Sequence, residues 1–283
     1  MNLLMPRSTY DPLSVKLPTV SRECYDETVF HLIEQLRRDS ERSEHLFFSE
    51  IGKFKHGGAT YAIPRFFFRG PGVQDEPVRI GIFAAIHGDE PETAHAALEF
   101  LRRLLEEPER ARGYELYVYP VCNPTGVENN TRHSHSGKDL NREFWKGSAE
   151  PEVYYLEREL GVLLFQGVIA LHADDTTSGV YAYVRGATLT EALARPAIKA
   201  AEAFLPRAKE LIIDGFNAKD ALIHGQCFDG VLSNPVELKP APFELIFETP
   251  QEEPFELQVQ ATVAALDSIL EEYRPFLAFG QNL

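Results

Sequence analysis

The stretch that decides the fold is residues 78–90, VRIGIFAAIHGDE. Its first nine residues are mostly apolar and rich in β-branched and aromatic side chains, which predicts a buried strand rather than a helix. After Pro91, apolar residues recur at the spacing of one helix face: Ala94, Ala97, Leu98, Leu101 and Leu105. His87 and Glu90 therefore fall where a strand ends and a helix begins, at the sheet edge where open α/β proteins bind ligands.

The histidine and the glutamate of this turn are both metal ligands. Catalytic zinc sites commonly combine two histidines with one glutamate, so His87 and Glu90 would leave a third ligand to come from elsewhere. The alternative is structural, because Asp89, Glu90 and Glu92 also suit the positive end of a helix dipole. The motif alone does not choose between the two.

Three later segments place further polar groups at the ends of apolar runs. The first, residues 123–142, carries NPTG and GKDLNR. The second is VIALHADD at 168–175, and the third is FELIFETP at 243–250. In chain order the polar residues of interest are Asn123, Arg132, Asp139, Asn141, Arg142, His172 and Glu248. The order and spacing of these groups favour a metal site, since a motif gains weight from its structural context.

With these segments the chain resembles the zinc carboxypeptidase family, and in particular its shorter branch of aspartoacylases and succinylglutamate desuccinylases. The resemblance spans roughly residues 76–270 and rests on His87, Glu90, Arg132, Asp139-Leu140-Asn141-Arg142, His172 and Glu248. It implies one zinc ion per chain, held by His87, Glu90 and His172.

The resemblance also implies a role for each remaining motif residue. Glu248 would be the general base, and Arg132 would stabilise the oxyanion. Asn141 and Arg142 would bind the terminal carboxylate of the substrate, whose shape matches the guanidinium fork. Asp139 would accept a hydrogen bond from a ligand histidine. The alternative for Glu248 is a solvated carboxylate at the end of an edge strand.

Strands that alternate with helices predict an α/β fold, with a mixed, largely parallel twisted sheet and helices on both faces. The 283 residues, 44% of them hydrophobic, can build a sizeable core. We expect a catalytic domain over residues 76–283. Residues 1–75 would form an N-terminal extension, with a helix from Cys24 to about Arg42 and an edge hairpin around Gly57-Gly58. The segments 123–150 and 214–242 exceed ordinary loop lengths, which favours a functional role.

Composition excludes several partners and sites. The net charge of −15 argues against nucleic acid and anionic membranes. No apolar run approaches the ~20 residues that span a bilayer, and the absence of a secretory signal predicts a cytoplasmic protein. The three cysteines, Cys24, Cys122 and Cys227, are too few and too far apart for a disulfide framework. His133 and His135, on a loop rich in serine and glycine, are expected to be solvated rather than ligands.

The chain departs from the pancreatic branch of the family in one visible way. That branch has a tyrosine on a substrate-covering loop before the catalytic glutamate, but no tyrosine lies between Asp214 and Glu248 here. Tyr181, Tyr183 and Tyr273 remain alternatives. The interval between ligands is also short, so small substrates are favoured over protein tails.

Three functions remain open at this stage. The first is a carboxypeptidase that acts on small peptides with a free amine, which Asp174 and Asp175 would attract unless they form a solvated turn. The second is an N-acyl amino acid amidohydrolase. The third is a carboxylate-binding module without catalysis, against which the complete set of ligands and base argues. The expected partner is a small peptide or acyl-amino-acid substrate. The oligomeric state stays open.

Overall fold

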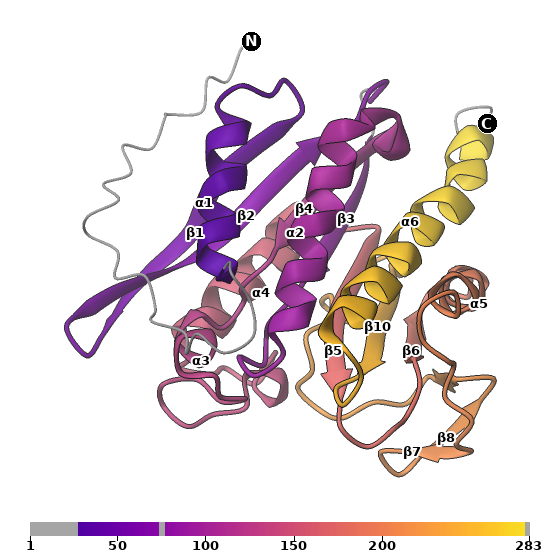
Figure 1. Cartoon of the computed structure of the whole chain (residues 1–283). Coiled ribbons are helices and arrows are strands. Elements are labelled where there is room, and N and C mark those ends of the chain that lie inside the picture. Colours follow the sequence, from indigo (N-terminus) through magenta and orange to yellow (C-terminus); the bar gives the residue numbers. More distant parts are fainter. Residues whose placement is uncertain (1–27, 74–76, 281–283) are drawn as a thin grey trace.

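A computed structural model describes residues 28–73 and 77–280 of the chain (Figure 1). Within these residues ten strands form one sheet, in the order β1-β2-β4-β3-β5-β10-β6-β9-β8-β7. The strands are β1 Leu46–His56, β2 Ala59–Arg69, β3 Val78–Phe83, β4 Tyr114–Tyr119, β5 Gly167–Asp174, β6 Tyr181–Gly186, β7 Ile212–Ile213, β8 Phe216–Lys219, β9 Leu222–His224 and β10 Phe243–Pro250.

The predicted mixed α/β sheet is confirmed, but the prediction that it is largely parallel is wrong. Four neighbouring pairs are parallel and five are antiparallel, and the parallel pairs are concentrated at the centre. Strands β4, β3, β5 and β10 run parallel to one another, and β6 with β9 is the other parallel pair. The remaining neighbouring pairs are antiparallel, including β1 with β2 and β10 with β6. The two-residue turn at Gly57-Gly58 makes the pairing of β1 with β2 antiparallel, because parallel strands need a longer connection.

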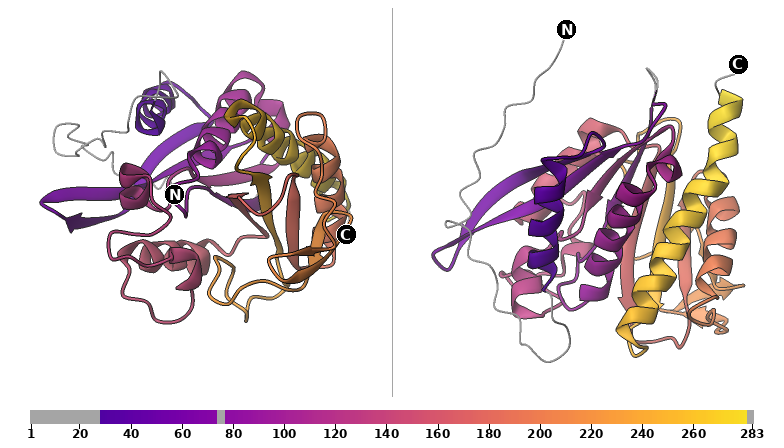
Figure 2. Two further views of the ribbon diagram at one scale, coloured as in Figure 1. Left: turned by 60° about the horizontal axis from the view of Figure 1, so that its bottom comes forward. Right: turned by 45° about the horizontal axis from the view of Figure 1, so that its top comes forward.

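Helices cover both faces of the sheet (Figure 2). One face carries α1 Val29–Ser40, α2 Pro91–Glu106, α5 Leu189–Ala201 and α6 Phe255–Gly280, and α4 Pro151–Leu163 lies on the other. Alternation along β3 serves both layers: Ile80 and Ile82 pack with the first group, and Phe83 packs with α4. Each face of the central strands is therefore buried, as near-continuous apolar runs require.

Most predicted elements are present, with boundaries shifted by a few residues. The helix predicted from Cys24 begins at Val29 among the described residues, and Cys24 itself lies outside them. Helix α6 continues past Pro275 to Gly280. The segment 123–150 contains the short helix α3 Pro124–Asn129 and a 3₁₀ turn, η2 Leu140–Arg142. Another 3₁₀ turn, η1 Pro108–Ala111, follows α2.

The segment 214–242 is not one long loop as predicted, because it contains the short strands β8 and β9. The turn between them places Asp220 and Ala221 at φ +54° and +62°, and the turn before β8 places Asp214 at φ +53°. Two successive positive φ angles are typical of tight hairpin turns, which usually use glycine or asparagine. Because aspartate and alanine occupy these positions, the residue types carry no clear turn signal.

Of the helices described, none is long and apolar enough to cross a bilayer. Cys122 is buried and Cys227 is half-buried, and both are free thiols.

The turn between β3 and α2 is fixed by close backbone contacts. Ala85 adopts φ +46°, and its amide donates to Thr93 Oγ1 at 2.9 Å. The amide of Gly88 donates to the Thr131 carbonyl at 3.0 Å, and a Cβ at Gly88 would lie 1.9 Å from the backbone of Gly126. This turn is therefore locked against residues 123–131.

We expect Gly88→Ala to destabilise the protein by about 1–3 kcal/mol or more, because the new methyl group has no room and the backbones must separate. Gly161→Ala is the matched control: this glycine lies in α4, and a methyl group added there would have no neighbouring atom within 4 Å. Alanine at that position should stabilise the helix by up to about 1 kcal/mol. Urea unfolding of the two variants measures the difference, and equal midpoints would contradict the packing argument.

Candidate metal centre

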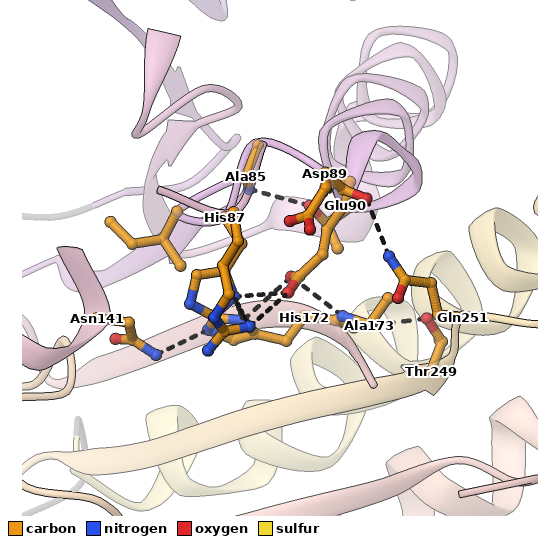
Figure 3. Close-up of polar contacts among 12 residues, drawn as sticks. Ala85, His87, Asp89, Glu90, Asn141, His172, Ala173, Thr249 and Gln251 are labelled. Atoms are coloured by element: carbon orange, nitrogen blue, oxygen red, sulfur yellow. Dashed lines mark hydrogen bonds and ion pairs between the residues drawn. The ribbon is translucent and has the colours of Figure 1, made fainter. Parts of the chain in front are cut away.

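His87, Glu90 and His172 meet at the carboxyl edge of the central sheet (Figure 3). His87 lies in the turn after β3, Glu90 precedes the first residue of α2, and His172 lies in β5. Because β3 pairs with β5 in parallel, their carboxyl ends reach the same edge. One ligating atom of each residue lies within 4.8 Å of the other two, and all three side chains are buried.

The distances show that three electron-rich atoms face one small volume. His87 Nδ1 lies 2.5 Å from Glu90 Oε1, and His172 Nδ1 lies 3.1 Å from Glu90 Oε2. The two Nδ1 atoms are 3.2 Å apart. Two imidazole nitrogens and one carboxylate oxygen are a donor set that zinc uses in catalytic sites, so the residues present fit such an ion.

The electrostatics of the cluster favour a bound positive charge. Burial alone would lower the pKa of His87, but Glu90 and Asp139 raise it to about 9. Burial opposes ionisation of Glu90, yet the two imidazoles hold its pKa far below its usual range. Burial lowers the pKa of His172. The Glu90 carboxylate is thus stable only with a cation, either a proton on His87 or a metal ion, beside it.

Groups outside the cluster orient both histidines. Asp139 Oδ1 lies 3.2 Å from His87 Nε2, on the ring edge away from Glu90. Asn141 Nδ2 lies 3.3 Å from His172 Nε2, and the amide of Leu232 donates to Asn141 Oδ1 at 2.8 Å. Contacts of this kind fix the ring orientation of metal ligands.

Two arginines project into the same cavity, which has a volume of about 230 Å³. Arg132 donates to Asp139 Oδ2 from Nη2 at 3.0 Å, and its Nη1 lies 3.2 Å from His87 Nδ1. Arg142 donates to the Asn141 carbonyl at 2.8 Å, and its guanidinium lies over the Phe228 ring at 4.1 Å. Arg132 and Arg142, both singled out from the sequence, therefore line the same cavity as the three candidate metal ligands.

Glu248 lies beside the cluster because of strand register. In β10 it is paired with His172 of β5 on one side and with Tyr181 of β6 on the other. Burial, reinforced by Glu90, Asp174 and Asp214, raises the pKa of Glu248 well above its usual value. It is a buried carboxyl in the cavity and not a solvated strand end, and its surroundings favour the protonated form more than water does.

The structure distinguishes the three tyrosines that the sequence left open. Tyr183 donates its hydroxyl to Asp214 Oδ2 at 2.7 Å. Tyr273 lies in α6 against Phe243 and Tyr114, outside the cavity lining. Tyr181 lines the cavity, and its buried hydroxyl has no hydrogen-bond partner among the described residues. Only Tyr181 therefore combines position and a free hydroxyl.

Several residues that line the cavity were missed from the sequence. They come from β10 and from segment 214–242, whose unusual length was the only signal: Asp214, Cys227, Phe228, Val231 and Ile246. Asp174 and Asp175 also line the cavity. His133 is exposed as predicted, but the prediction of a solvated His135 is wrong, since its half-buried ring packs 4.2 Å from that of His56.

Comparison with known proteins relates part of the chain to a family of hydrolases. Residues 78–212 match the family model of the succinylglutamate desuccinylase/aspartoacylase catalytic domain. A comparison with curated proteins gives no match. Glu248 lies beyond the matched range, so its assignment rests on the geometry.

Solved structures share the fold at low sequence identity. A "putative metallopeptidase" from Shewanella denitrificans OS217 is 24% identical, with a TM-score of 0.71 over 85% of this chain and 88% of that chain. Its counterpart from Shewanella amazonensis SB2B is 22% identical, with a TM-score of 0.70 over 86% and 92%. A metallo-carboxypeptidase from Burkholderia cenocepacia is 16% identical, with a TM-score of 0.66 over 86% and 68%.

The fold is shared with metallopeptidases and metallo-carboxypeptidases of known structure, and the described residues contain a candidate metal site. Residues 78–212 relate the chain to the catalytic domain of succinylglutamate desuccinylases and aspartoacylases. The resemblance inferred from the sequence is thereby confirmed.

If His172 is a ligand, His172→Ala should bind one metal ion fewer per chain than the unmodified protein, because two remaining ligands hold a metal weakly. Glu248→Gln should bind as much metal as the unmodified protein. His133→Ala, at an exposed histidine, is the control and should also keep its metal. Elemental analysis after loading with zinc and desalting decides it. Unchanged metal content in the His172 variant would remove this residue from the ligand set.

Proposed function

We propose that this protein is a zinc-dependent hydrolase that cleaves an amide bond next to a free carboxylate, as a carboxypeptidase of small peptides. One observation carries the proposal: Glu248 is buried between His172 and Tyr181, in the cavity that also holds the guanidinium groups of Arg132 and Arg142. A carboxylate-binding module without catalysis would not need a buried general base beside the metal ligands.

The carboxylate end of the substrate would bind at Asn141 and Arg142. The guanidinium of Arg142 is held over the Phe228 ring at 4.1 Å and by the Asn141 carbonyl at 2.8 Å, so it is oriented before substrate arrives. A rigid fork can form two parallel hydrogen bonds to a carboxylate. This contact would place the adjacent amide toward the metal ligands.

The remaining side chains supply the proton transfers of hydrolysis. Bound zinc would supply a Lewis acid and lower the pKa of water toward about 7. Glu248 would take a proton from the attacking water and deliver it to the nitrogen of the leaving amine as the C–N bond breaks. Arg132 would donate to the oxygen on which negative charge develops, and the free hydroxyl of Tyr181 is a second donor beside Glu248.

The charges of the cavity favour a substrate with a free amine. Asp174, Asp175 and Asp214 line it together with Glu248. A succinyl or other acidic acyl group would bring a further negative charge among these carboxylates, which is costly where solvation is poor. The cavity of about 230 Å³ suits a short peptide better than a protein tail.

The second candidate is an N-acyl amino acid amidohydrolase. It shares the metal ligands, the base and the arginine clamp, and differs in the group on the far side of the scissile bond. The match of residues 78–212 to the desuccinylase/aspartoacylase domain is the observation that favours it.

Glu248→Gln should lower turnover by about 10²- to 10⁴-fold, the usual scale for loss of a general base. Glu252→Gln, at an exposed glutamate nearby in sequence, is the matched control and should leave turnover unchanged. Steady-state kinetics on a good substrate tests both, and a loss below tenfold at Glu248 would place the base elsewhere.

Arg142→Lys should be costly although it keeps the charge, because an ammonium group cannot reproduce the fork or its stacking on Phe228. We expect kcat/KM to fall about tenfold or more for free-acid substrates and to change little for the corresponding C-terminal amides. Equal losses on both substrates would exclude Arg142 from carboxylate binding.

A substrate panel separates the two candidate activities. Short peptides with a free amine should be hydrolysed faster than the matching N-acetyl and N-succinyl amino acids, for the electrostatic reason given above. The comparison uses kcat/KM of the zinc-loaded protein. A tenfold advantage of the acylated set would reverse the order of the two candidates.

A further inference from the structure

A second cluster of ligating groups lies outside the lining of the cavity, where the loop of residues 131–138 meets the start of α4. His135 belongs to the loop, and Glu150 and Glu152 flank Pro151, the first residue of the helix. One ligating atom of each of the three residues lies within 4.8 Å of the other two.

Glu152 is the unusual member of this cluster. The residue is 0% exposed, and neither of its carboxylate oxygens has a hydrogen-bond partner among the described residues. Nδ1 of His135 is also buried without a partner. Three ligating atoms of the cluster therefore form no hydrogen bond with the described residues.

Glu150 adds a second carboxylate, fixed in place by serines. Ser134 Oγ donates to Glu150 Oε2 at 2.8 Å, and Ser136 Oγ donates to Oε1 at 2.6 Å. Each carboxylate oxygen has two lone pairs, so both atoms can still accept another contact. The serines orient Glu150 but bring no positive charge.

Two neighbouring buried carboxylates need a compensating charge. Burial of an ionised carboxylate is unfavourable without a counter-charge, and neither Glu150 nor Glu152 forms an ion pair with any lysine or arginine in the described part of the chain. Burial, reinforced by the charge of Glu150, raises the pKa of Glu152 to about 7. The neighbouring hydroxyl of Thr125, which donates to Asn123 Oδ1 at 3.2 Å, lowers this pKa less than burial raises it.

We propose that His135, Glu150 and Glu152 bind a divalent transition-metal ion, separate from the one in the cavity. Two carboxylates neutralise the charge of such an ion, and one imidazole nitrogen completes a mixed nitrogen and oxygen set. Imidazole suits zinc and carboxylates suit manganese, so Zn²⁺ and Mn²⁺ are the ions to test. This inference does not rest on the proposed function.

The ion would join three parts of the fold. The ring of His135 packs 4.2 Å from that of His56 at the end of β1, and its amide donates to Thr125 Oγ1 at 3.1 Å. Glu150 and Glu152 anchor the other side at α4. Arg132, which lines the cavity, lies three residues before His135 on the same loop. An ion bound at His135 would therefore restrain the loop that carries Arg132.

Metal stoichiometry tests the proposal. Unmodified protein, Glu152→Gln, His172→Ala and the double variant are stripped with chelator, loaded with excess Zn²⁺ or Mn²⁺, desalted and measured by elemental analysis. We expect about two ions per chain in the unmodified protein, about one in each single variant and none in the double variant. Glu143→Gln is the matched control: this acid is also held by a serine, Ser148, at 2.8 Å, and it should still bind two.

The outcomes separate this proposal from the assignment of the cavity. A single ion that disappears in the His172 variant and persists in the Glu152 variant would overturn the second site and leave the first intact. A single ion with the reverse behaviour would support the second site and remove the first. Two ions in the Glu152 variant would overturn the proposal.

A stability measurement guards against misfolding of the variants. Mn²⁺ should raise the Tm of His172→Ala, where only the second site remains, and should not raise the Tm of the double variant. If Glu152→Gln does not fold, His135→Asn replaces it in every comparison, because the half-buried His135 tolerates change more readily and the same stoichiometry is expected. Absence of a Tm shift in His172→Ala would overturn the second site.

Discussion

Parallel pairing of β3 with β5 and of β5 with β10 is the constraint on which the site depends. It brings the carboxyl ends of three strands to one edge, and each strand delivers one chemical function there: His87 after β3, His172 in β5 and Glu248 in β10. The register matters as much as the direction, because a one-residue slip of β10 would turn Glu248 to the opposite face. Apolar burial on both sides of these strands holds that register.

Charge compensation is the second constraint, since the site gathers several carboxylates where water is scarce. Glu90 is balanced by His87 and His172, and Asp139 is balanced by Arg132 and His87. Glu248 has weaker compensation and keeps a raised pKa, which suits a group that must exchange protons. The same physics applies at the buried carboxylate of α4, Glu152, for which no lysine or arginine among the described residues supplies the counter-charge.

The two long segments give the cavity its specificity. Residues 123–150 bring Arg132 and Arg142, while residues 214–242 bring Asp214 and Phe228. Backbone contacts tie the segments together: the Phe144 amide donates to the Gly230 carbonyl at 3.1 Å, and Trp145 Nε1 donates to the Ser233 carbonyl at 2.9 Å. The proposed carboxylate clamp would therefore be built jointly by residues about ninety positions apart, such as Asn141 and Leu232.

The sequence by itself determined most of the central elements and the turn that carries His87 and Glu90, whereas His172 entered the candidate ligand set through the family resemblance. Local patterns sufficed for those elements and that turn, because the apolar run 78–86, the hairpin around Gly57-Gly58 and the spacing of His87 and Glu90 each lie within a few residues of one another. Only the tertiary structure decided that Tyr181 rather than Tyr183 or Tyr273 has a free hydroxyl in the cavity, that Phe228 supports Arg142, and that His135 faces Glu152. These facts depend on strand register, on turns formed without glycine at Asp220-Ala221, and on packing between distant segments. No local pattern encodes such contacts, because each is set by how the whole chain buries its apolar surface.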